Sequence, residues 1–309
     1  MPFMRVFYQV FSLFLIMGAG WAFARRGYLE KEATRGISNL ILKLTLPCLI
    51  VGSLQKPFSP DLLSVSLFTL AVATAFYLGI MGLSVLAVRV MRTPPRQRGA
   101  LAFSLSFSNC AFIGFPVVSS ILGEDALFIT SIHNVLFNIL AFSAGVVMMQ
   151  GESGTVSRKS VPLSRVFNLN VIATLVGFAL FLGSVTIPSL LLVPLTALGS
   201  LTTPLAMIVT GAMLARTPMR AAFGDWRVFA TAALRLAAWP LLAWVALRAA
   251  GVSGQLGAIT VIVAGMPAAS NTGIIAEVYG GDTETASSSV FLSTLFSVVS
   301  IPVLAFFLA

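Results

Sequence analysis

The sequence contains few charged residues and few residues of the kinds that bind metals. Of its 309 residues only 9% are Asp, Glu, Lys or Arg, and it has one histidine and two cysteines. The mean hydropathy is +0.98. A soluble chain of this length could not bury so much apolar side chain, so the composition predicts an all-α integral membrane protein. Cys48 and Cys110 lie inside apolar segments, where packing is favoured over metal binding.

The chain also lacks the motifs of common enzyme and pump classes. It has no paired-aspartate cluster, no His-Glu-x-x-His, no Gly-x-Ser-x-Gly and no Gly-x-x-x-x-Gly-Lys-Ser/Thr. We therefore expect no enzyme activity, no metal, no bound cofactor and no nucleotide-driven pumping. The net charge of +9 is spread over short loops without an aromatic-interleaved basic face, so we expect no nucleic-acid partner.

The apolar runs are numerous enough for about ten membrane-spanning helices, at roughly 20 residues per span. No segment between them is long and polar enough to form a separate soluble domain. The sequence predicts helices near residues 6–24, 36–54, 62–91, 98–122, 125–149, 167–186, 190–214, 227–250, 255–279 and 284–308.

Two motifs recur at the same spacing, which indicates an internal duplication. Leu44-Thr-Leu-Pro47 matches Leu201-Thr-Thr-Pro204, and each proline lies 157 residues from its counterpart. Gly123-Glu-Asp125 matches Gly280-Gly-Asp282 with the same spacing of 157 residues. Either match alone would be weak, but the shared spacing favours two copies of one unit.

The most polar stretch of the chain, residues 151–160, lies between the two copies. We therefore predict one repeat over residues 1–154 and a second over residues 155–309. Each copy holds five predicted spans, which is an odd number. The second copy must then enter the membrane upside down relative to the first, as in many secondary transporters.

Basic residues are concentrated in alternate loops, which predicts the orientation in the membrane. The loops after the second, fourth and sixth spans contain only Lys56, and Arg5 and Arg248 do not fit the pattern. Because positively charged loops stay in the cytoplasm, we predict a multi-pass protein of the cell inner membrane with both termini outside. The predicted cytoplasmic set is Arg25, Arg26, Lys31, Arg35, Arg92, Arg96, Arg98, Arg158, Lys159, Arg165, Arg216, Arg220 and Arg227.

Two predicted spans contain helix-breaking residues near their middle: Gly114 and Pro116 in the fourth, and Gly265, Pro267 and Gly273 in the ninth. Unwound chain at this depth must face protein or a watery cavity, because lipid cannot satisfy free backbone groups. A broken helix also presents a positively polarised N-terminus that attracts anions. Simple proline kinks are the alternative, but two breaks at related positions favour a transport site.

The residues around the two breaks are the candidate binding residues. The candidates for substrate binding are Asn109, Pro116, Pro267, Ser270, Asn271 and Thr272. The exposed carbonyl groups, with the side chains of Ser108, Asn109, Ser270, Asn271 and Thr272, could instead bind a cation. Pro47 and Pro204 are expected to kink the second and seventh spans. They are interpreted either as bends in the flanking helices or as a wall of the substrate path.

Ionisable side chains within membrane spans are functional candidates because burying charge is costly. Lys43 and Arg235 lie toward the cytoplasmic ends of their spans, so snorkelling to the interface is favoured over a charge-carrying role. Glu277 is interpreted as interfacial or as a carrier of charge. His133 is interpreted as a hydrogen-bonded packing residue in preference to a proton carrier. The neighbouring Asn134 and Asn138 share a helix face that could line the crossing. The residues of this group are Lys43, His133, Arg235 and Glu277.

Three segments carry a resemblance to a known family: Leu44-Thr-Leu-Pro-Cys-Leu49, Ser108-Asn-Cys-Ala-Phe-Ile-Gly-Phe-Pro116 and Ala264-Gly-Met-Pro-Ala-Ala-Ser-Asn271. With them, the whole chain resembles the auxin efflux carrier family, including its bacterial members of the malonate- or malate-permease type. The resemblance implies a fold shared with bile-acid symporters and sodium/proton antiporters. The first, second, sixth and seventh spans would form a scaffold. The others would form a mobile transport domain in which the fourth and ninth spans cross at their breaks.

The resemblance also implies a small organic anion as substrate and a homodimer formed through the scaffold. Carried over by motif, Asn109, Pro116 and Pro267 mark the crossing, with Asn271 nearby. Sodium-coupled bile-acid relatives place an acidic residue before the crossing on the ninth span, whereas the segment 261–266 has no carboxylate here. A cation site could still be formed in part by Ser108, Asn109, Thr130 and Asn134. Coupling to H⁺, to Na⁺ or to neither ion is therefore open.

The sequence as a whole predicts a secondary transporter that moves a small carboxylate-bearing anion by an elevator-like shift of the transport domain. The partners expected are that anion and the lipid bilayer. A passive channel and a non-transporting membrane sensor of the same fold are the alternatives.

Overall fold

The computed structural model describes residues 2–150, 167–216 and 223–308, and every named element within these ranges is helical. The all-α prediction is therefore confirmed for the described residues. In chain order the elements are α1 (Pro2–Arg25), α2 (Lys31–Leu40), η1 (Ile41–Thr45), α3 (Leu46–Ser53), α4 (Pro60–Val90), α5 (Pro95–Ser106), η2 (Cys110–Gly114), α6 (Phe115–Leu122), α7 (Ala126–Ala141), α8 (Ala144–Gln150), α10 (Leu169–Leu182), α11 (Ser189–Ser200), α12 (Thr202–Arg216), α14 (Trp226–Ala233), η3 (Leu234–Ala238), α15 (Trp239–Ala249), α16 (Gly254–Ala264), α17 (Thr272–Tyr279) and α18 (Thr283–Leu308).

Six helical runs of the described chain are long and apolar enough to cross a membrane, so the full count of ten spans stays a prediction. The six runs are Lys31–Ser53, Pro60–Val90, Ala126–Gln150, Ser189–Arg216, Trp226–Ala249 and Thr283–Leu308. Shorter apolar helices occupy Cys110–Leu122, Leu169–Leu182 and Gly254–Ala264. The predicted repeat boundary and the loop residues Arg158, Lys159, Arg165 and Arg220 lie outside the described residues, as does the side chain of Arg5.

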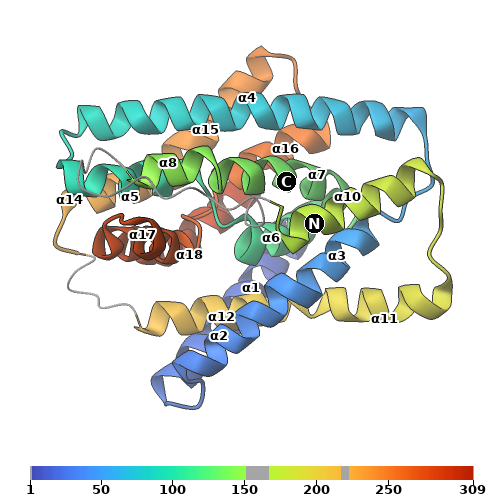
Figure 1. Cartoon of the computed structure of the whole chain (residues 1–309), viewed down its shortest axis with the longest axis horizontal. Helices are drawn as coiled ribbons and strands as arrows, with labels where there is room; N and C mark the ends of the chain where they lie inside the picture. Colours follow the sequence, from blue (N-terminus) through green and yellow to red (C-terminus); the bar gives the residue numbers. More distant parts are fainter. Residues whose placement is uncertain (1, 151–166, 217–222, 309) are drawn as a thin grey trace.

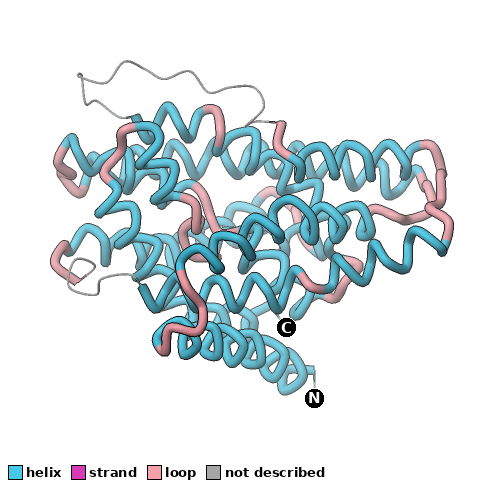
Figure 2. The backbone as a smooth tube through the Cα atoms, turned by 60° about the horizontal axis from the view of Figure 1, so that its bottom comes forward, coloured by secondary structure: helices cyan, strands magenta, loops and turns pink. Residues whose placement is uncertain are grey.

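The helices form two groups that lie against each other (Figure 1). In one group α1 packs along α12, and α3 packs against α10 and α11. In the other, α4 packs against α5 and α7, and α14 packs against α18. Figure 2 shows loop segments among the helices in the middle of the molecule, in addition to the loops at its two ends. The two groups are joined by contacts of α1 with α6 and α18, and of α12 with η2.

The contact between α1 and α12 depends on two glycines. A Cβ atom on Gly211 would lie 1.9 Å from the backbone oxygen of Met17, and one on Gly20 would lie 2.3 Å from the backbone oxygen of Ile208. Neither position can therefore accept a larger residue without moving backbone. Small residues at a helix contact allow the two backbones to approach closely, as in many membrane helix pairs.

Three π-helical turns, η1, η2 and η3, each end two residues before a proline: Pro47, Pro116 and Pro240. In each, the residue before the proline donates its N–H to the carbonyl five residues earlier. A proline ring clashes with the carbonyl four residues back, and widening the turn relieves that clash. Pro204 instead lies in the first turn of α12, where a missing N–H costs nothing.

The fourth span is interrupted, but the prediction that Gly114 and Pro116 interrupt it is wrong. The helix runs from η2 into α6 through both residues, because the π turn accommodates the proline. The chain leaves the helix earlier, over residues 107–109, between α5 and η2. In the ninth span the break covers residues 265–271, so Gly265 and Pro267 lie in it, whereas Gly273 lies inside α17.

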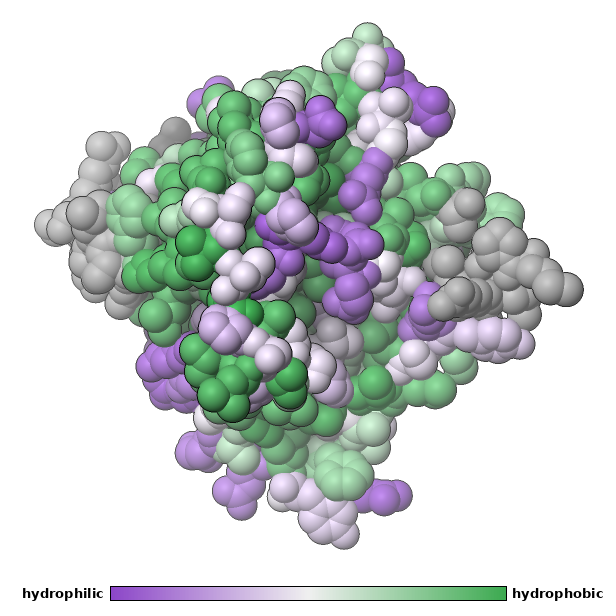
Figure 3. Space-filling model, turned by 90° about the vertical axis from the view of Figure 1, so that its right-hand side faces the viewer, coloured by the Kyte–Doolittle hydropathy of each residue, from purple (hydrophilic) through white to green (hydrophobic). Residues whose placement is uncertain are grey.

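The exterior is largely apolar, as expected for a surface that contacts lipid. Large side chains such as Leu190, Phe307 and Val90 are more than 70% exposed. At the end of the molecule shown in Figure 3, hydrophilic residues gather near the centre and are flanked by apolar ones. This is the end at which α3 finishes and α4 begins (Figure 1).

Candidate functional site

The two interruptions lie side by side and satisfy each other's backbone groups. Ser108 and Ala268 form an isolated antiparallel bridge. The backbone N–H of Asn109 donates to the carbonyl of Pro267 at 2.8 Å, and the N–H of Ala269 donates to the carbonyl of Phe107 at 3.0 Å. All six residues are buried. Because hydrocarbon cannot replace these hydrogen bonds, the pairing allows irregular chain at the centre of an apolar bundle.

The Asn109 side chain connects the two interruptions a second time. Its Oδ1 accepts a hydrogen bond from the N–H of Phe112 at 3.1 Å, which caps the N-terminus of η2. Its Nδ2 donates to Ser270 Oγ at 2.6 Å. Asn271 occupies the equivalent cap position of α17, where its side chain makes no capping hydrogen bond. One N-terminal end is thus capped by an amide oxygen, and the other has no side-chain cap.

A cavity of about 340 Å³ opens beside this crossing. Predicted site residues that line it are Lys43, Ser108, Asn109, Asn134, Ser270 and Asn271. Lys43 is the only charged residue among the lining residues that the structure describes, and none of them is acidic. The Oδ1 atom of Asn134 is buried and has no hydrogen-bond partner within the described chain. The cavity therefore offers amides, hydroxyl groups and one ammonium group, which suits a small anion.

Three further asparagines line the same cavity: Asn138, Asn168 and Asn170. Asn168 Nδ2 donates to Asn138 Oδ1 at 2.8 Å, while Asn168 Oδ1 caps the N-terminus of α10. Sequence reasoning placed Asn138 on the helix face of Asn134 but did not single out Asn168 or Asn170. Two asparagines directly before an apolar run were the available signal, because asparagine is a preferred helix N-cap.

The other predicted site residues lie away from the cavity. Pro116 is buried in α6, and Pro267 contributes its carbonyl to the backbone pairing. The Thr272 hydroxyl donates to the carbonyl of Ala269, and that of Thr130 donates to the carbonyl of Ala126 within α7. Glu277 is exposed on α17. These five residues therefore do not line the cavity beside the crossing.

His133 is buried away from the cavity as well. Its ring centroid lies 5.4 Å from that of Tyr77 and 5.9 Å from that of Phe76. His133 therefore packs against aromatic rings, as the packing part of the prediction expected. Its Nε2 atom makes no hydrogen bond with the described residues.

The prediction that Arg235 snorkels to the membrane interface is wrong. The residue is 1% exposed, and its guanidinium donates to the carbonyl groups of Leu105, Met266 and Val263. The turn η3 directs this side chain into the bundle, where backbone carbonyls at the two breaks accept its N–H groups. Lys43, in contrast, is exposed at the rim of the cavity.

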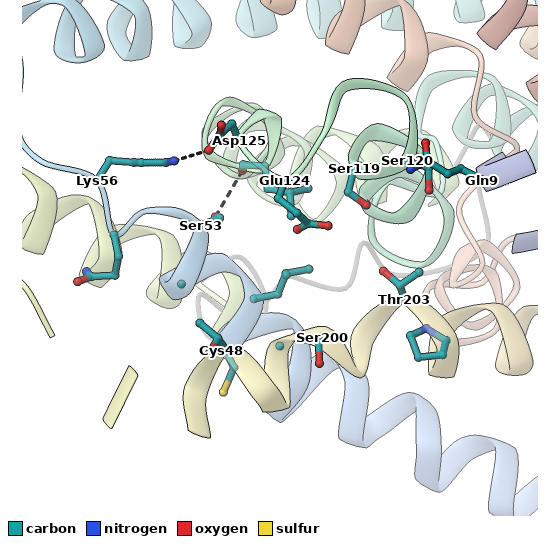
Figure 4. Close-up of a pocket in the computed structure, with 17 residues that line it drawn as sticks. Gln9, Cys48, Ser53, Lys56, Ser119, Ser120, Glu124, Asp125, Ser200 and Thr203 are labelled. Carbon is teal, nitrogen blue, oxygen red and sulfur yellow. Dashed lines mark hydrogen bonds and ion pairs between the residues drawn. The ribbon is translucent and has the colours of Figure 1, made fainter. Parts of the chain in front are cut away.

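A second cavity, of about 580 Å³, lies between the two groups of helices (Figure 4). Cys48, Ser200, Thr203 and Pro204 line one side of it, from α3, α11 and α12, and Gln9 of α1 lies near Ser120. Ser119, Ser120, Glu124 and Asp125 line the other side, from α6 and the loop that follows. Of the predicted proline pair, Pro204 therefore lines this second cavity, whereas Pro47 lines neither it nor the cavity beside the crossing.

Two contacts join the two groups of helices beside this second cavity. Lys56, in the loop after α3, donates a hydrogen bond to Asp125. The hydroxyl groups of Ser53 on α3 and Ser131 on α7 lie 3.1 Å apart. The hydrogen bond from Lys56 lowers the pKa of Asp125 below its ordinary value. Burial raises the pKa of the neighbouring Glu124, with the negative charge of Asp125 as the smaller cause.

A helical bundle with two paired chain breaks, and beside them a cavity lined by asparagines and apolar side chains, is typical of multi-pass membrane transporters. The chain belongs to the membrane transport protein family, whose model matches residues 5–305. This match confirms the resemblance to the auxin efflux carrier family. Membership also directs the interpretation away from enzyme activity.

Individual relatives agree with the family assignment. An uncharacterized transporter of Methanothermobacter thermautotrophicus is 26% identical over 318 residues, covering 98% of both chains. An uncharacterized transporter of Methanocaldococcus jannaschii is 23% identical over 283 residues, covering 89% of this chain and 90% of the relative. A candidate malonate transporter of Rhizobium meliloti is 22% identical over 298 residues, covering 94% of this chain and 92% of the relative.

Proposed function

We propose that the protein is a secondary transporter of a small organic anion that carries a carboxylate group. The observation that supports this most directly is the cavity beside the paired breaks, which is lined by asparagines and Lys43 and by no acidic residue. Amide and hydroxyl donors with one ammonium group match the acceptor oxygens of a carboxylate. A relative described as a candidate malonate transporter adds support for a short dicarboxylate as the probe of choice.

The proposed fold is a pair of inverted five-helix repeats, residues 1–154 and 155–309, with ten spans in all. The spacing of 157 residues between matching motifs supports it. So do Asp125 and Asp282, which occupy matching positions and each pair with a basic residue. The partner of Asp125 is Lys56, and the partner of Asp282 is Arg96, with Nε and Oδ2 3.1 Å apart.

The proposed mechanism is alternating access of the elevator type. The scaffold would comprise α1, α2, α3, α10, α11 and α12, and the moving domain would comprise α4 to α8 and α14 to α18. The two cavities support this division, because each is bounded by residues of both groups and they lie in different places between them. Movement of one group past the other would close one cavity while enlarging the other.

The proposed orientation places both termini outside the cell inner membrane, by the positive-inside pattern of the loops. In this orientation the cavity that contains Lys43 would open toward the cytoplasm, and the cavity lined by Lys56 and Asp125 would face outward. We also propose a homodimer through the scaffold. On α11, Leu190 is 84% exposed and Val193 is 66% exposed, which leaves an apolar face for lipid or a second copy.

The transport proposal is tested by counterflow in proteoliposomes. Vesicles preloaded with unlabelled malonate should accumulate radiolabelled malonate with saturable kinetics, and other short carboxylates should compete. Repeating the assay with Na⁺ gradients and with pH gradients identifies the coupling ion. Single-channel currents would instead favour a passive pore. A folded protein that transports none of the acids would favour a membrane sensor.

Native mass spectrometry tests the proposed homodimer. A protein that is monomeric at every concentration would contradict it.

A further inference from the structure

Arg235 lies deep inside the bundle and is held entirely by backbone carbonyl groups. It is the largest of the side chains that the structure describes as fully buried. Its Nη1 donates to the carbonyl of Leu105 at 2.5 Å, its Nε donates to that of Met266 at 2.9 Å, and its Nη2 reaches that of Val263 at 3.5 Å. Burial of a charge among apolar helices is costly unless it is compensated, so the groups around Arg235 must offset its charge.

The accepting carbonyls belong to the C-terminal ends of two half-helices. Leu105 lies in the last turn of α5, Val263 lies in the last turn of α16, and Met266 follows just beyond it. The last carbonyls of a helix have no partner within the helix, and they give its C-terminus a partial negative charge of about half an electron. One guanidinium group therefore binds the C-terminal ends of both broken helices at once.

No carboxylate shares in this arrangement. The ion pairs between described residues include Lys56 with Asp125, Arg96 with Asp282, and Arg227 with Asp225, and Arg235 forms none with a described residue. Arginine stays protonated in proteins. Its charge of +1 is then offset mainly by two half-helix C-termini with roughly −0.5 each.

The opposite ends of the break are left uncompensated. The N-termini of the second half-helices, at η2 and α17, carry about +0.5 each and lie at residues that line the cavity. Without a cation at position 235, the negative C-termini would cancel much of this positive potential. With Arg235 in place, the electrostatic potential in the cavity stays positive and attracts a ligand with one negative charge.

Arg235 is also connected to the cavity through a short chain of contacts. It donates to the carbonyl of Met266, and the carbonyl of the next residue, Pro267, accepts from the N–H of Asn109. Asn109 then donates from its side chain to Ser270, and both of these residues line the cavity. The guanidinium thus holds residues 266–267 in place. The position of this segment sets the distance between the side chains of Asn109 and Ser270.

We propose that Arg235 is a positioning residue that makes the site selective for an anion, by neutralising the C-terminal ends of both half-helices so that their N-terminal counterparts attract the substrate. This inference rests on the proposed function, because it concerns the same cavity. It predicts that the charge of Arg235 governs substrate affinity although the side chain does not line the cavity.

The test compares variants that separate charge from hydrogen bonding. Arg235→Gln removes the charge, and Arg235→Lys keeps it. Trp239→Phe is the matched control, because the Trp239 Nε1–H donates to the same carbonyl of Leu105 at 3.0 Å without contributing charge. Each purified variant is assayed in proteoliposomes for the KM and Vmax of malonate counterflow. Binding is measured in parallel as the thermal shift with malonate and with neutral malonamide.

We expect Arg235→Gln to raise the KM for malonate roughly tenfold or more, because loss of a unit positive charge from the crossing weakens the attraction of an anion. Trp239→Phe should leave the KM within about twofold, and Arg235→Lys should preserve the preference for malonate over malonamide. A purely structural role would lower the amount of folded protein and leave the KM of the folded fraction unchanged. An unchanged KM in Arg235→Gln, or an equal rise in Trp239→Phe, overturns the proposal.

The remaining outcomes also decide the question. If Arg235→Gln does not fold, Arg235→Lys still tests the charge, and loss of anion preference in that variant overturns the proposal. Malonate binding that needs Arg235 but is not followed by uptake would refute transport and support the role of Arg235. Uptake with a wild-type KM in Arg235→Gln would support transport and refute that role. Wild-type protein that neither binds nor moves the acid refutes both.

Discussion

The hydroxyl of Thr202 donates a hydrogen bond to the hydroxyl of Thr45 at 3.0 Å, and both side chains are fully buried. The two residues are 157 positions apart, which is the spacing of the matching sequence motifs. A residue that contacts its own counterpart lies on the axis that relates two repeats. Because Thr45 belongs to η1 and Thr202 begins α12, the axis of the proposed repeats would pass through the proposed scaffold.

Cross-linking across this axis should leave transport intact. With Cys48 and Cys110 replaced by alanine, Thr45→Cys combined with Thr202→Cys should form a disulfide, because the side-chain oxygens already lie within hydrogen-bond distance. The scaffold does not change shape in an elevator mechanism, so the rate of malonate counterflow should stay within about twofold before and after oxidation. Mass spectrometry confirms the disulfide, and radiotracer counterflow measures the rate.

A disulfide between the two groups of helices should instead stop transport. In the same background, Ser53→Cys with Ser131→Cys joins α3 to α7, where the native hydroxyls lie 3.1 Å apart. Oxidation should abolish counterflow and reduction should restore it, because the moving domain is then fixed to the scaffold. Full activity in the oxidised protein would argue against an elevator.

Asn109→Ala should lower transport more than Cys48→Ala does. The first change removes both the cap on η2 and the hydrogen bond to Ser270, whereas the second shortens a half-buried side chain that makes no hydrogen bond with the described residues. Hydrogen bonds of this kind contribute about 1 kcal/mol each, so we expect a loss of counterflow of roughly tenfold for Asn109→Ala. Equal rates at equal reconstituted protein would show that the amide is not needed.

Glu124 and Asp125 should affect stability with opposite signs. Burial raises the pKa of Glu124, so its ionisation opposes folding as the pH rises above the ordinary value of about 4.3. Glu124→Gln should therefore raise the melting temperature at pH 7.5, with the difference vanishing near pH 4. The pKa of Asp125 is lowered by Lys56, so Asp125→Asn should lower the melting temperature at pH 7.5 and lose its effect in acid.

Differential scanning fluorimetry at pH 2.5, 4, 5.5 and 7.5 measures both variants, because the lowered pKa of Asp125 keeps its carboxylate ionised in the folded protein near pH 4. The effect of Asp125→Asn should be small, because 82% of its side-chain surface is exposed and such ion pairs contribute little. A pH-independent difference for Glu124→Gln would mean that packing, and not ionisation, determines its effect.

Gly211→Ala should destabilise the protein strongly. The new Cβ would lie 1.9 Å from the backbone oxygen of Met17, so α1 and α12 must separate. We expect a loss of more than about 2 kcal/mol, seen as a lower melting temperature and poor recovery in detergent. Gly18→Ala is the matched control, since no atom lies within 4 Å of the Cβ it would add, and it should leave stability unchanged or slightly higher. Similar melting temperatures for the two variants would refute the close contact.

The candidate site was partly predictable from the sequence because its main signals are local. The sequence singled out Asn109, Ser270 and Asn271 because they lie close to Pro267 or to a glycine-containing motif within an apolar run. In such a run only protein or water can satisfy free backbone groups. The position of the fourth-span break was not predictable in the same way. Pro116 marks a π turn there, and the actual break at residues 107–109 is stabilised by pairing with residues 267–269.

The sequence by itself determined that this chain is helical, that lipid surrounds it and which family it belongs to, because composition, apolar run length and short motifs are properties of neighbouring residues. Tertiary structure alone decided the direction of Arg235 and the inclusion of Asn168 and Asn170 in the cavity. Each of these depends on partners from distant parts of the chain: 130 residues separate Arg235 from Leu105, and 30 separate Asn168 from Asn138. A side chain near the end of a span can turn outward or inward, and only the carbonyl groups brought together by folding fixed the choice for Arg235.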